Sequence, residues 1–149
     1  MSTVRKMLED KKENNKVYSV PMDATILDAL KVMAEADTGC VLVTDGDKFV
    51  GIFSERDYAR QVELAGHCAK DTLVSSVMTK ELVSVKPETS VQQCMELMTK
   101  YHIRHLPVVA DEHVVGMISI GDVVRIKIED AESTINELEN YITGTGYGR

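Results

Sequence analysis

Two short stretches of the chain combine residue types that suit a phosphorylated nucleoside. They are GIFSERD (Gly51–Asp57) and GMISIGD (Gly116–Asp122), each with a serine three residues after the glycine and an aspartate three residues later. A helix that begins at the serine presents free backbone N–H groups to an anion, and the hydroxyl adds a donor for a phosphate. The carboxylate accepts hydrogen bonds from two vicinal hydroxyls, as on a ribose. Apolar strand residues before the serine suit the face of a purine.

The same spacing also suits a purely structural role. Ser-x-x-Asp at the start of a helix is a capping box, and most short motifs of this kind only cap. The recurrence of the motif favours a shared function. Gly, Ser, Asp and a following Arg (Arg60, Arg125) are the same in both copies, whereas the residues between them differ. The two roles are compatible, because a side chain that caps a helix can also contact a ligand at the start of that helix.

Both motifs end a duplicated segment. A shift of 65 residues places Val17–Arg60 on Leu82–Arg125 over 44 positions without a gap, and nine positions are identical. Two copies are too few for a solenoid. They predict one α/β domain built from two similar halves that face each other across a pseudo-twofold axis.

Each copy has the pattern of a β-α-β-β-α unit. Capping boxes at Thr25 and Ser90 precede apolar residues at helical spacing, and β-branched runs split by a polar turn predict a hairpin. A second helix begins at Ser54 or Ser119. The expected strands are Val17–Val20, Cys40–Thr44 and Phe49–Phe53 in the first copy, and Leu82–Val85, Leu106–Ala110 and Val114–Ser119 in the second.

The segments outside the copies are predicted to be mostly helical. We expect an N-terminal helical arm (1–16), the first repeat (17–60), a linker with a short helical turn at Val74–Thr79 (61–81), the second repeat (82–125) and a C-terminal helix extension with a tail (126–149). The arm places Val4, Met7 and Leu8 on one side. The C-terminal helix has a heptad-like apolar stripe of Val124, Ile128, Ala131, Ile135, Leu138 and Ile142.

The tail contains GTGYG (Gly144–Gly148). This glycine pattern follows a helix and not a strand, so it is not a dinucleotide-binding fingerprint, and we expect it to fray.

Composition limits the classes of partner and compartment. The 149 residues are 44% hydrophobic and carry a formal charge of −7, so nucleic acid and anionic membranes are not expected partners of the surface as a whole. Cys40, Cys68 and Cys94 form no CxxC, which indicates reduced thiols. The N-terminus lacks the apolar region of a signal peptide, and no run approaches the ~18 apolar residues of a membrane span. We therefore expect a cytoplasmic protein.

The sequence contains no convincing metal or catalytic constellation. His102 and His105 are three residues apart but lie at a helix-to-strand transition, and no cysteine pair has ligand spacing. A P-loop and a GxSxG motif are both absent, so we expect no enzyme and no catalytic residue. Mg²⁺ carried by a nucleotide is the metal that fits better.

The repeat pattern, the two motif endings and the stretch RHLPVV (Arg104–Val109) resemble a tandem pair of CBS domains, the regulatory modules named after cystathionine β-synthase. The resemblance covers 88 of 149 residues in the repeats. It implies a regulatory module that binds an adenosine-containing ligand (AMP, ADP, ATP, NAD(H) or an S-adenosyl compound) in the cleft between the repeats and senses energy or redox state. It also implies a homodimer and an effector protein of unknown identity.

Two other function classes stay open. The chain is a structural or dimerisation module with empty clefts that acts through protein partners, or an enzyme that acts on a nucleotide. A nucleotide retained by the purified protein separates the first from a ligand sensor, and turnover of ATP or NAD separates the second.

The resemblance assigns roles residue by residue. Asp57 and Asp122 would hold the ribose, and Ser54 and Ser119 would meet ribose or phosphate. The adenine pockets would be lined by Ser19–Pro21 and Gly39–Leu42 in one site and by Ser84–Lys86 and Ile103–Pro107 in the other. From these ranges the expected contacts are Ser19, Val20, Cys40, Val41, Ser84, Val85 and Pro107.

The two sites are predicted to differ in their cations. Arg104 and His105 stand where the first repeat has Gly39 and Cys40, and Arg56 stands where the second has a glycine. Because a guanidinium makes bidentate contacts with phosphate, we expect these three side chains to supply charge to phosphates. The alternative for the two arginines is a solvated surface charge. For the recurring arginines of the second helices, Arg60 and Arg125, we expect structural ion pairs.

Overall fold

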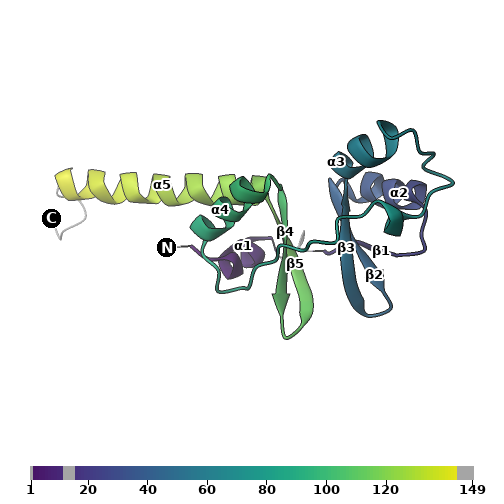
Figure 1. Cartoon of the computed structure of the whole chain (residues 1–149). Coiled ribbons are helices and arrows are strands. Elements are labelled where there is room, and N and C mark those ends of the chain that lie inside the picture. The colour runs from purple at the N-terminus through teal and green to yellow at the C-terminus, as the bar shows by residue number, and fades with distance from the viewer. Residues whose placement is uncertain (1, 12–15, 144–149) are drawn as a thin grey trace. The chain divides into compact units, whose positions relative to one another are not determined.

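The computed structural model describes residues 2–11 and 16–143, which fall into two compact units (Figure 1). The repeat-1 unit is Lys16–Val83, and the repeat-2 unit combines Ser84 onward with the N-terminal arm. The expected fraying of Gly144–Gly148 lies outside the described residues.

The repeat-1 unit is a three-stranded sheet with helical cover. Its sheet has the order β1-β2-β3, with β1 parallel to β2 and β2 antiparallel to β3. Thr25 and Asp28 close both hydrogen bonds of a capping box at 3.1 Å, which fixes the start of the first helix as predicted. The elements are β1 (Ser19–Pro21), α2 (Ile26–Ala36), β2 (Cys40–Asp45), β3 (Lys48–Ser54), α3 (Glu55–Asp57), a π-helical turn η1 (Tyr58–Glu63) and a 3₁₀ turn η2 (Val74–Ser76).

The core of this unit lies between the sheet and α2. Apolar side chains of period two on the strands meet the apolar stripe of the helix, and this burial is the main stabilising term. Val43 and Phe53 from the sheet and Ile26 from α2 are fully buried. The core therefore fixes β2, β3 and the turn after β3, where the first motif lies.

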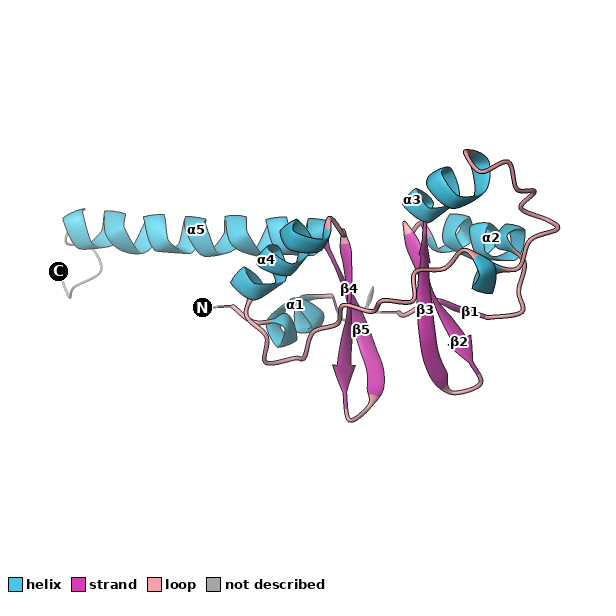
Figure 2. Ribbon diagram, in the orientation of Figure 1, coloured by secondary structure: helices cyan, strands magenta, loops and turns pink. Residues whose placement is uncertain are grey.

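The repeat-2 unit contains a β-hairpin and three helices, which lie on one side of the hairpin (Figure 2). Ser90 and Gln93 form the predicted capping box, with hydrogen bonds of 3.0 and 3.1 Å. The elements are α1 (Val4–Asp10), α4 (Val91–Tyr101), β4 (His105–Ala110), β5 (His113–Ser119) and α5 (Ile120–Thr143).

The predicted strand Leu82–Val85 is not formed; a single parallel bridge between Val85 and Val108 replaces it. Proline gives the physical reason. In repeat 1 the N–H of Leu42 donates to Tyr18 O at 3.0 Å, but the equivalent residue of repeat 2 is Pro107, which has no N–H. The ladder therefore loses the hydrogen bond that would extend it toward Leu82.

The arm and the linker perform the same task in the two units. The arm segment Ser2–Val4 pairs with the residues that start α4, and the linker segment Thr72–Val74 pairs with the residues that start α2. Each unit is thus completed by the segment that precedes the other repeat in sequence. The hydrogen bonds are Val4 N to Thr89 O (2.9 Å), Val91 N to Ser2 O (3.1 Å), Val74 N to Ala24 O (2.9 Å) and Ile26 N to Thr72 O (2.9 Å).

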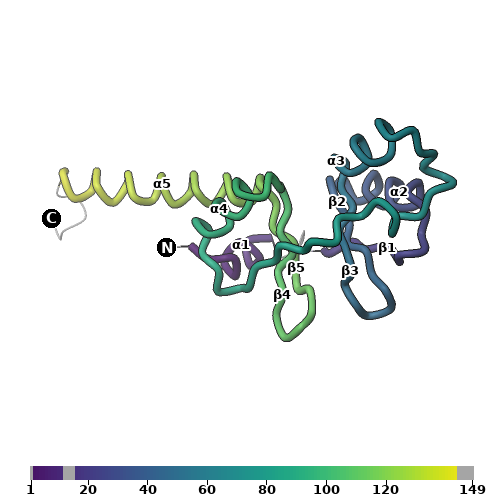
Figure 3. Tube along the Cα trace, in the orientation of Figure 1, coloured from purple at the N-terminus to yellow at the C-terminus, as the bar shows by residue number. Residues whose placement is uncertain are grey.

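The arm helix α1 buries the apolar side that the sequence indicated, because Val4 and Met7 are fully buried. At the other end of the chain, α5 continues well past α4 (Figure 3). Its outer apolar stripe is solvent-exposed, with Ile128 53% and Ile142 80% accessible. No helix in the described residues is long and apolar enough to cross a membrane.

Candidate functional site

The repeat-1 motif forms a capping box, and the partners of its carboxylate among the described residues are a backbone amide and two hydroxyls. Asp57 N donates to Ser54 Oγ at 3.1 Å, while Asp57 Oδ2 accepts from Ser54 N at 3.0 Å and from Ser54 Oγ at 3.1 Å. Its other oxygen, Oδ1, accepts from Thr79 Oγ1 at 3.2 Å. Within the described residues no cation lies within ion-pair distance of Asp57. The carboxylate is half-buried at the start of α3.

The motif glycine explains why the linker reaches this carboxylate. A Cβ at Gly51 would lie 2.6 Å from Met78 Sδ and 3.1 Å from Thr79 O, which is closer than packed side chains tolerate. The missing side chain lets Thr79 exchange two backbone hydrogen bonds with Ile52, at 2.8 and 3.0 Å. This pairing places the threonine hydroxyl on Asp57.

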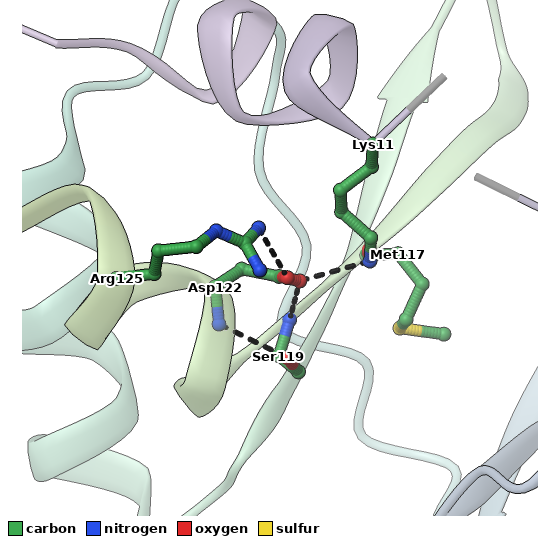
Figure 4. Close-up of polar contacts among 5 residues, drawn as sticks. All are labelled: Lys11, Met117, Ser119, Asp122 and Arg125. Carbon is green, nitrogen blue, oxygen red and sulfur yellow. Dashed lines mark hydrogen bonds and ion pairs between the residues drawn. The ribbon is translucent and has the colours of Figure 1, made fainter. Parts of the chain in front are cut away.

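The repeat-2 motif closes the same cap but gives its carboxylate two cationic partners (Figure 4). Asp122 N donates to Ser119 Oγ at 3.2 Å, and Ser119 N donates to Asp122 Oδ2 at 2.8 Å. Lys11 Nζ lies 2.9 Å from Oδ2, and Arg125 Nη2 lies 3.1 Å from Oδ1. The same ammonium donates to Met117 O at 3.0 Å. The structural ion pair expected for Arg125 is therefore confirmed.

Burial of this ion pair affects its protonation. The side chains of Asp122 and Lys11 are only 7% and 17% exposed. Burial alone would raise the pKa of the Asp122 carboxyl, but the Lys11 ammonium and the Ser119 amide outweigh it and hold that pKa below its ordinary value. Asp122 is therefore a charged acceptor at neutral pH.

The first recurring arginine behaves differently from Arg125. Arg60 lies on the π-helical turn η1 and is exposed, and in the part of the chain that the structure describes it has no ion-pair partner. The structural ion pair that we expected for Arg60 is therefore not observed. A π-helical turn rotates the side chains that follow α3 relative to those of a regular helix.

The other predicted residues of repeat 1 occupy different surroundings. Ser19 is exposed on β1, whereas the side chains of Val20 and Val41 pack in the core. Cys40 is buried and lies opposite Ser54 in the β2–β3 ladder. Burial, followed by the nearby carboxylates of Asp57 and Glu55, raises the pKa of its thiol to about 12, so the thiol stays neutral.

One further cation adjoins the repeat-1 motif. Arg56 lies in the first turn of α3, next to the motif aspartate in sequence, and is exposed.

The predicted residues of repeat 2 divide into two groups. His105 lies opposite Ser119 in the β4–β5 ladder, and the carbonyl of exposed Arg104 accepts from Ile120 N at 2.8 Å, so both adjoin the motif. Ser84 and Val85 instead line a shallow pocket of about 390 Å³ beside α4. Pro107 is buried and accepts from Val85 N at 2.9 Å.

Sequence reasoning missed two side chains that touch the motif carboxylates. Thr79 comes from the linker, and Lys11 comes from the arm, 111 positions before Asp122. Nothing in the charged sequence around Lys11 indicates that this lysine contacts a residue so far along the chain. Metal chemistry finds no support in residues 2–11 and 16–143, where no group of three or more His, Cys, Asp or Glu side chains clusters.

Comparisons with known proteins agree with this architecture. The CBS domain family model matches residues 13–63 and 74–129. The CBS domain-containing protein CBSX3, mitochondrial, of Arabidopsis thaliana is 42% identical over 130 residues, which cover 84% of this chain and 63% of the relative. A CBS-domain protein from Burkholderia ambifaria MC40-6 has a TM-score of 0.83 and 42% identity over 87% of this chain and 96% of that one.

A more distant structure shows the fold alone. The CBS domain pair of protein MJ0100, solved in complex with 5-methylthioadenosine and S-adenosyl-L-methionine, has a TM-score of 0.74 and 23% identity, over 87% of this chain and 98% of that one. The matches to both repeats, together with the two β-hairpin units and their capped motifs, lead to one conclusion: this chain belongs to the CBS domain family, with two copies of the domain.

Proposed function

We propose that the chain is a regulatory module that binds an adenosine-containing ligand, AMP, ADP, ATP or NAD(H), at its Ser-x-x-Asp motifs. The observation that carries the proposal is the partner set of Asp57. Its carboxylate accepts from the hydroxyls of Ser54 and Thr79, which are the groups that ribose hydroxyls would replace without loss of hydrogen bonding. The ligands of the MJ0100 domain pair support the ligand class, because both contain adenosine.

Charge near the first motif supports a phosphate on that ligand. The exposed side chain of Arg56 immediately precedes Asp57 in sequence, at the start of α3. A phosphate near this motif would gain from the guanidinium, because arginine side chains commonly bind phosphate. Mg²⁺ would enter only with a nucleotide that carries it.

The module acts through binding, without a chemical step. A ligand changes the protein only by binding two of its states unequally, and a protein partner then responds to the change. We further propose that the protein acts in the cytoplasm as a homodimer. The effector protein to which it responds is not identified.

The test is calorimetric titration with AMP, ADP, ATP, NAD⁺, NADH and S-adenosylmethionine after bound nucleotide has been removed. We expect saturable binding of at least one ligand, and Asp57→Asn should weaken it about tenfold or more, because it removes a charged acceptor. Asp47→Asn, in the exposed turn between β2 and β3, is the matched control and should leave affinity unchanged. Absence of binding by all six ligands would refute the proposal.

A structural module is the second candidate, and the exposed stripe of α5 favours it. Ile135 and Leu138 are 53% and 56% exposed on a helix that a second copy would cover. Sedimentation of the wild type and Leu138→Glu tests it: a dimer that dissociates in the variant, without any nucleotide effect, supports dimerisation as the main role.

A further inference from the structure

Lys11 takes, in the repeat-2 unit, the position that Thr79 takes in the repeat-1 unit. Ile52 and Met117 are equivalent residues of the duplication, as are the two motif aspartates. Thr79 uses its N–H for Ile52 O (2.8 Å) and its hydroxyl for Asp57 (3.2 Å). Lys11 uses one ammonium for both equivalent acceptors, Met117 O (3.0 Å) and Asp122 (2.9 Å).

This replacement changes what a ligand must displace. A hydroxyl on a carboxylate exchanges for a ribose hydroxyl at little cost, because the two hydrogen bonds are alike. An ammonium on a buried carboxylate makes a charge-assisted hydrogen bond. If a ligand displaces the ammonium, both the ammonium and the carboxylate need new partners. Figure 4 shows the ammonium directly on the carboxylate, with the arginine on the other side.

The carboxylate of Asp122 also has little capacity left. Among the described residues it accepts three hydrogen bonds, from Ser119 N, Lys11 Nζ and Arg125 Nη2, and a carboxylate offers about four lone-pair positions. Asp57 also accepts three, but from one amide and two hydroxyls, whereas two of the three donors at Asp122 are cationic. A ribose brings two hydroxyl donors. One of the present donors must therefore leave, and Ser119 N is fixed by the cap.

Arm attachment decides which donor is able to leave. Lys11 follows the last turn of α1, whereas Arg125 is held one turn from Asp122 within the same helix. The start of α1 is anchored by Val4 and Ser2, but its end is joined to the hairpin through the Lys11 contacts. A small displacement of the end of α1 would therefore take the Lys11 ammonium off Asp122 and leave the Arg125 contact in place.

We propose that Lys11 is a built-in competitor for the ligand at Asp122, so that the motif of repeat 1 fills first and the motif of repeat 2 fills only when the end of α1 moves away. The proposal rests on the proposed function, since it requires an adenosine ligand. It makes the arm a regulatory element that sets unequal affinity in two motifs of the same chain.

The first experiment measures the second motif alone, in an Asp57→Asn background, with the six ligands named above. Lys11→Met keeps the aliphatic stem, removes the ammonium and should tighten binding about tenfold. Lys6→Met, an exposed lysine on the same helix, should change nothing. Unchanged or weaker binding in Lys11→Met, with ligand bound by the wild type, overturns the competitor role and leaves the proposed function intact.

A second measurement uses the wild type and does not depend on how the variant folds. An amine-reactive ester should label Lys11 slowly in the free protein and several-fold faster once both motifs are filled, while Lys6 stays constant. Protection of Lys11 at full occupancy overturns the inference. If none of the six ligands binds either the wild type or Lys11→Met, the proposed function fails, and the competitor role falls with it.

Discussion

Asp57 and Asp122 close the same capping box in the two units, and both accept a hydrogen bond from the N–H of their serine. Their remaining partners differ: hydroxyls surround the first, and a lysine and an arginine neutralise the second. The cap is enforced by residues three positions apart. One further partner of each carboxylate comes from a distant segment: Thr79 from the linker in the first unit and Lys11 from the arm in the second. These two residues differ in type, and the cap is the same in both units.

The largest effect is expected from removal of the two carboxylates. Asp122→Ala leaves the Lys11 ammonium buried without its partner and should cost about 3 kcal/mol or more of unfolding free energy. Asp57→Ala loses a cap and hydroxyl contacts, and should cost about 1 kcal/mol. Urea unfolding of both variants measures the difference. Equal costs would show that the ion pair adds nothing to the cap.

The motif glycine gives the next largest effect. Gly51→Ala forces Met78 and the backbone of Thr79 away from β3 and should cost about 1–3 kcal/mol. Gly121→Ala is the control: its Cβ would meet nothing closer than Ser119 Oγ at 3.6 Å, and alanine favours a helix, so we expect a gain of up to about 1 kcal/mol. Destabilisation of both variants alike would contradict this assignment of Gly51.

The charged partner makes the second unit sensitive to acid. The folded-state pKa of Asp122 lies below its ordinary value, so its ion pair contributes fully above the unfolded pKa of about 3.9 and is lost as pH falls toward the folded value. Lys11→Met should therefore cost about 2 kcal/mol at pH 7 and progressively less below about pH 4. Urea midpoints at pH 7, 5 and 3 test this. A constant difference over this range would show that the Lys11 contact does not depend on the charge of Asp122.

Features that depend on residues close in sequence were predictable, and contacts between residues far apart in sequence were not. The capping boxes at Thr25 and Ser90 follow from residues three apart, and the structure confirms both. The missing strand before Val85 depends on one proline that lies in the neighbouring strand, so the segment's own pattern did not reveal it. The Lys11 contact spans 111 positions and depends on how the arm packs, which no periodicity encodes.

The smallest effect concerns the two hairpin turns. Asp111 and Glu112 both have positive φ, 51° and 65°, as a two-residue type I′ turn requires, whereas the first hairpin uses Gly46 at 61°. Glutamate is strained in this conformation, so Glu112→Gly should stabilise the repeat-2 unit by up to about 1 kcal/mol. Asp47→Gly, at a turn position without positive φ, should instead destabilise slightly because it only adds freedom to the unfolded chain. Thermal unfolding of the two variants tests this difference. A higher midpoint for Glu112→Gly alone means that the second turn is strained and that the first avoids this strain with its glycine. A shift of the same sign in both variants would contradict that difference between the turns.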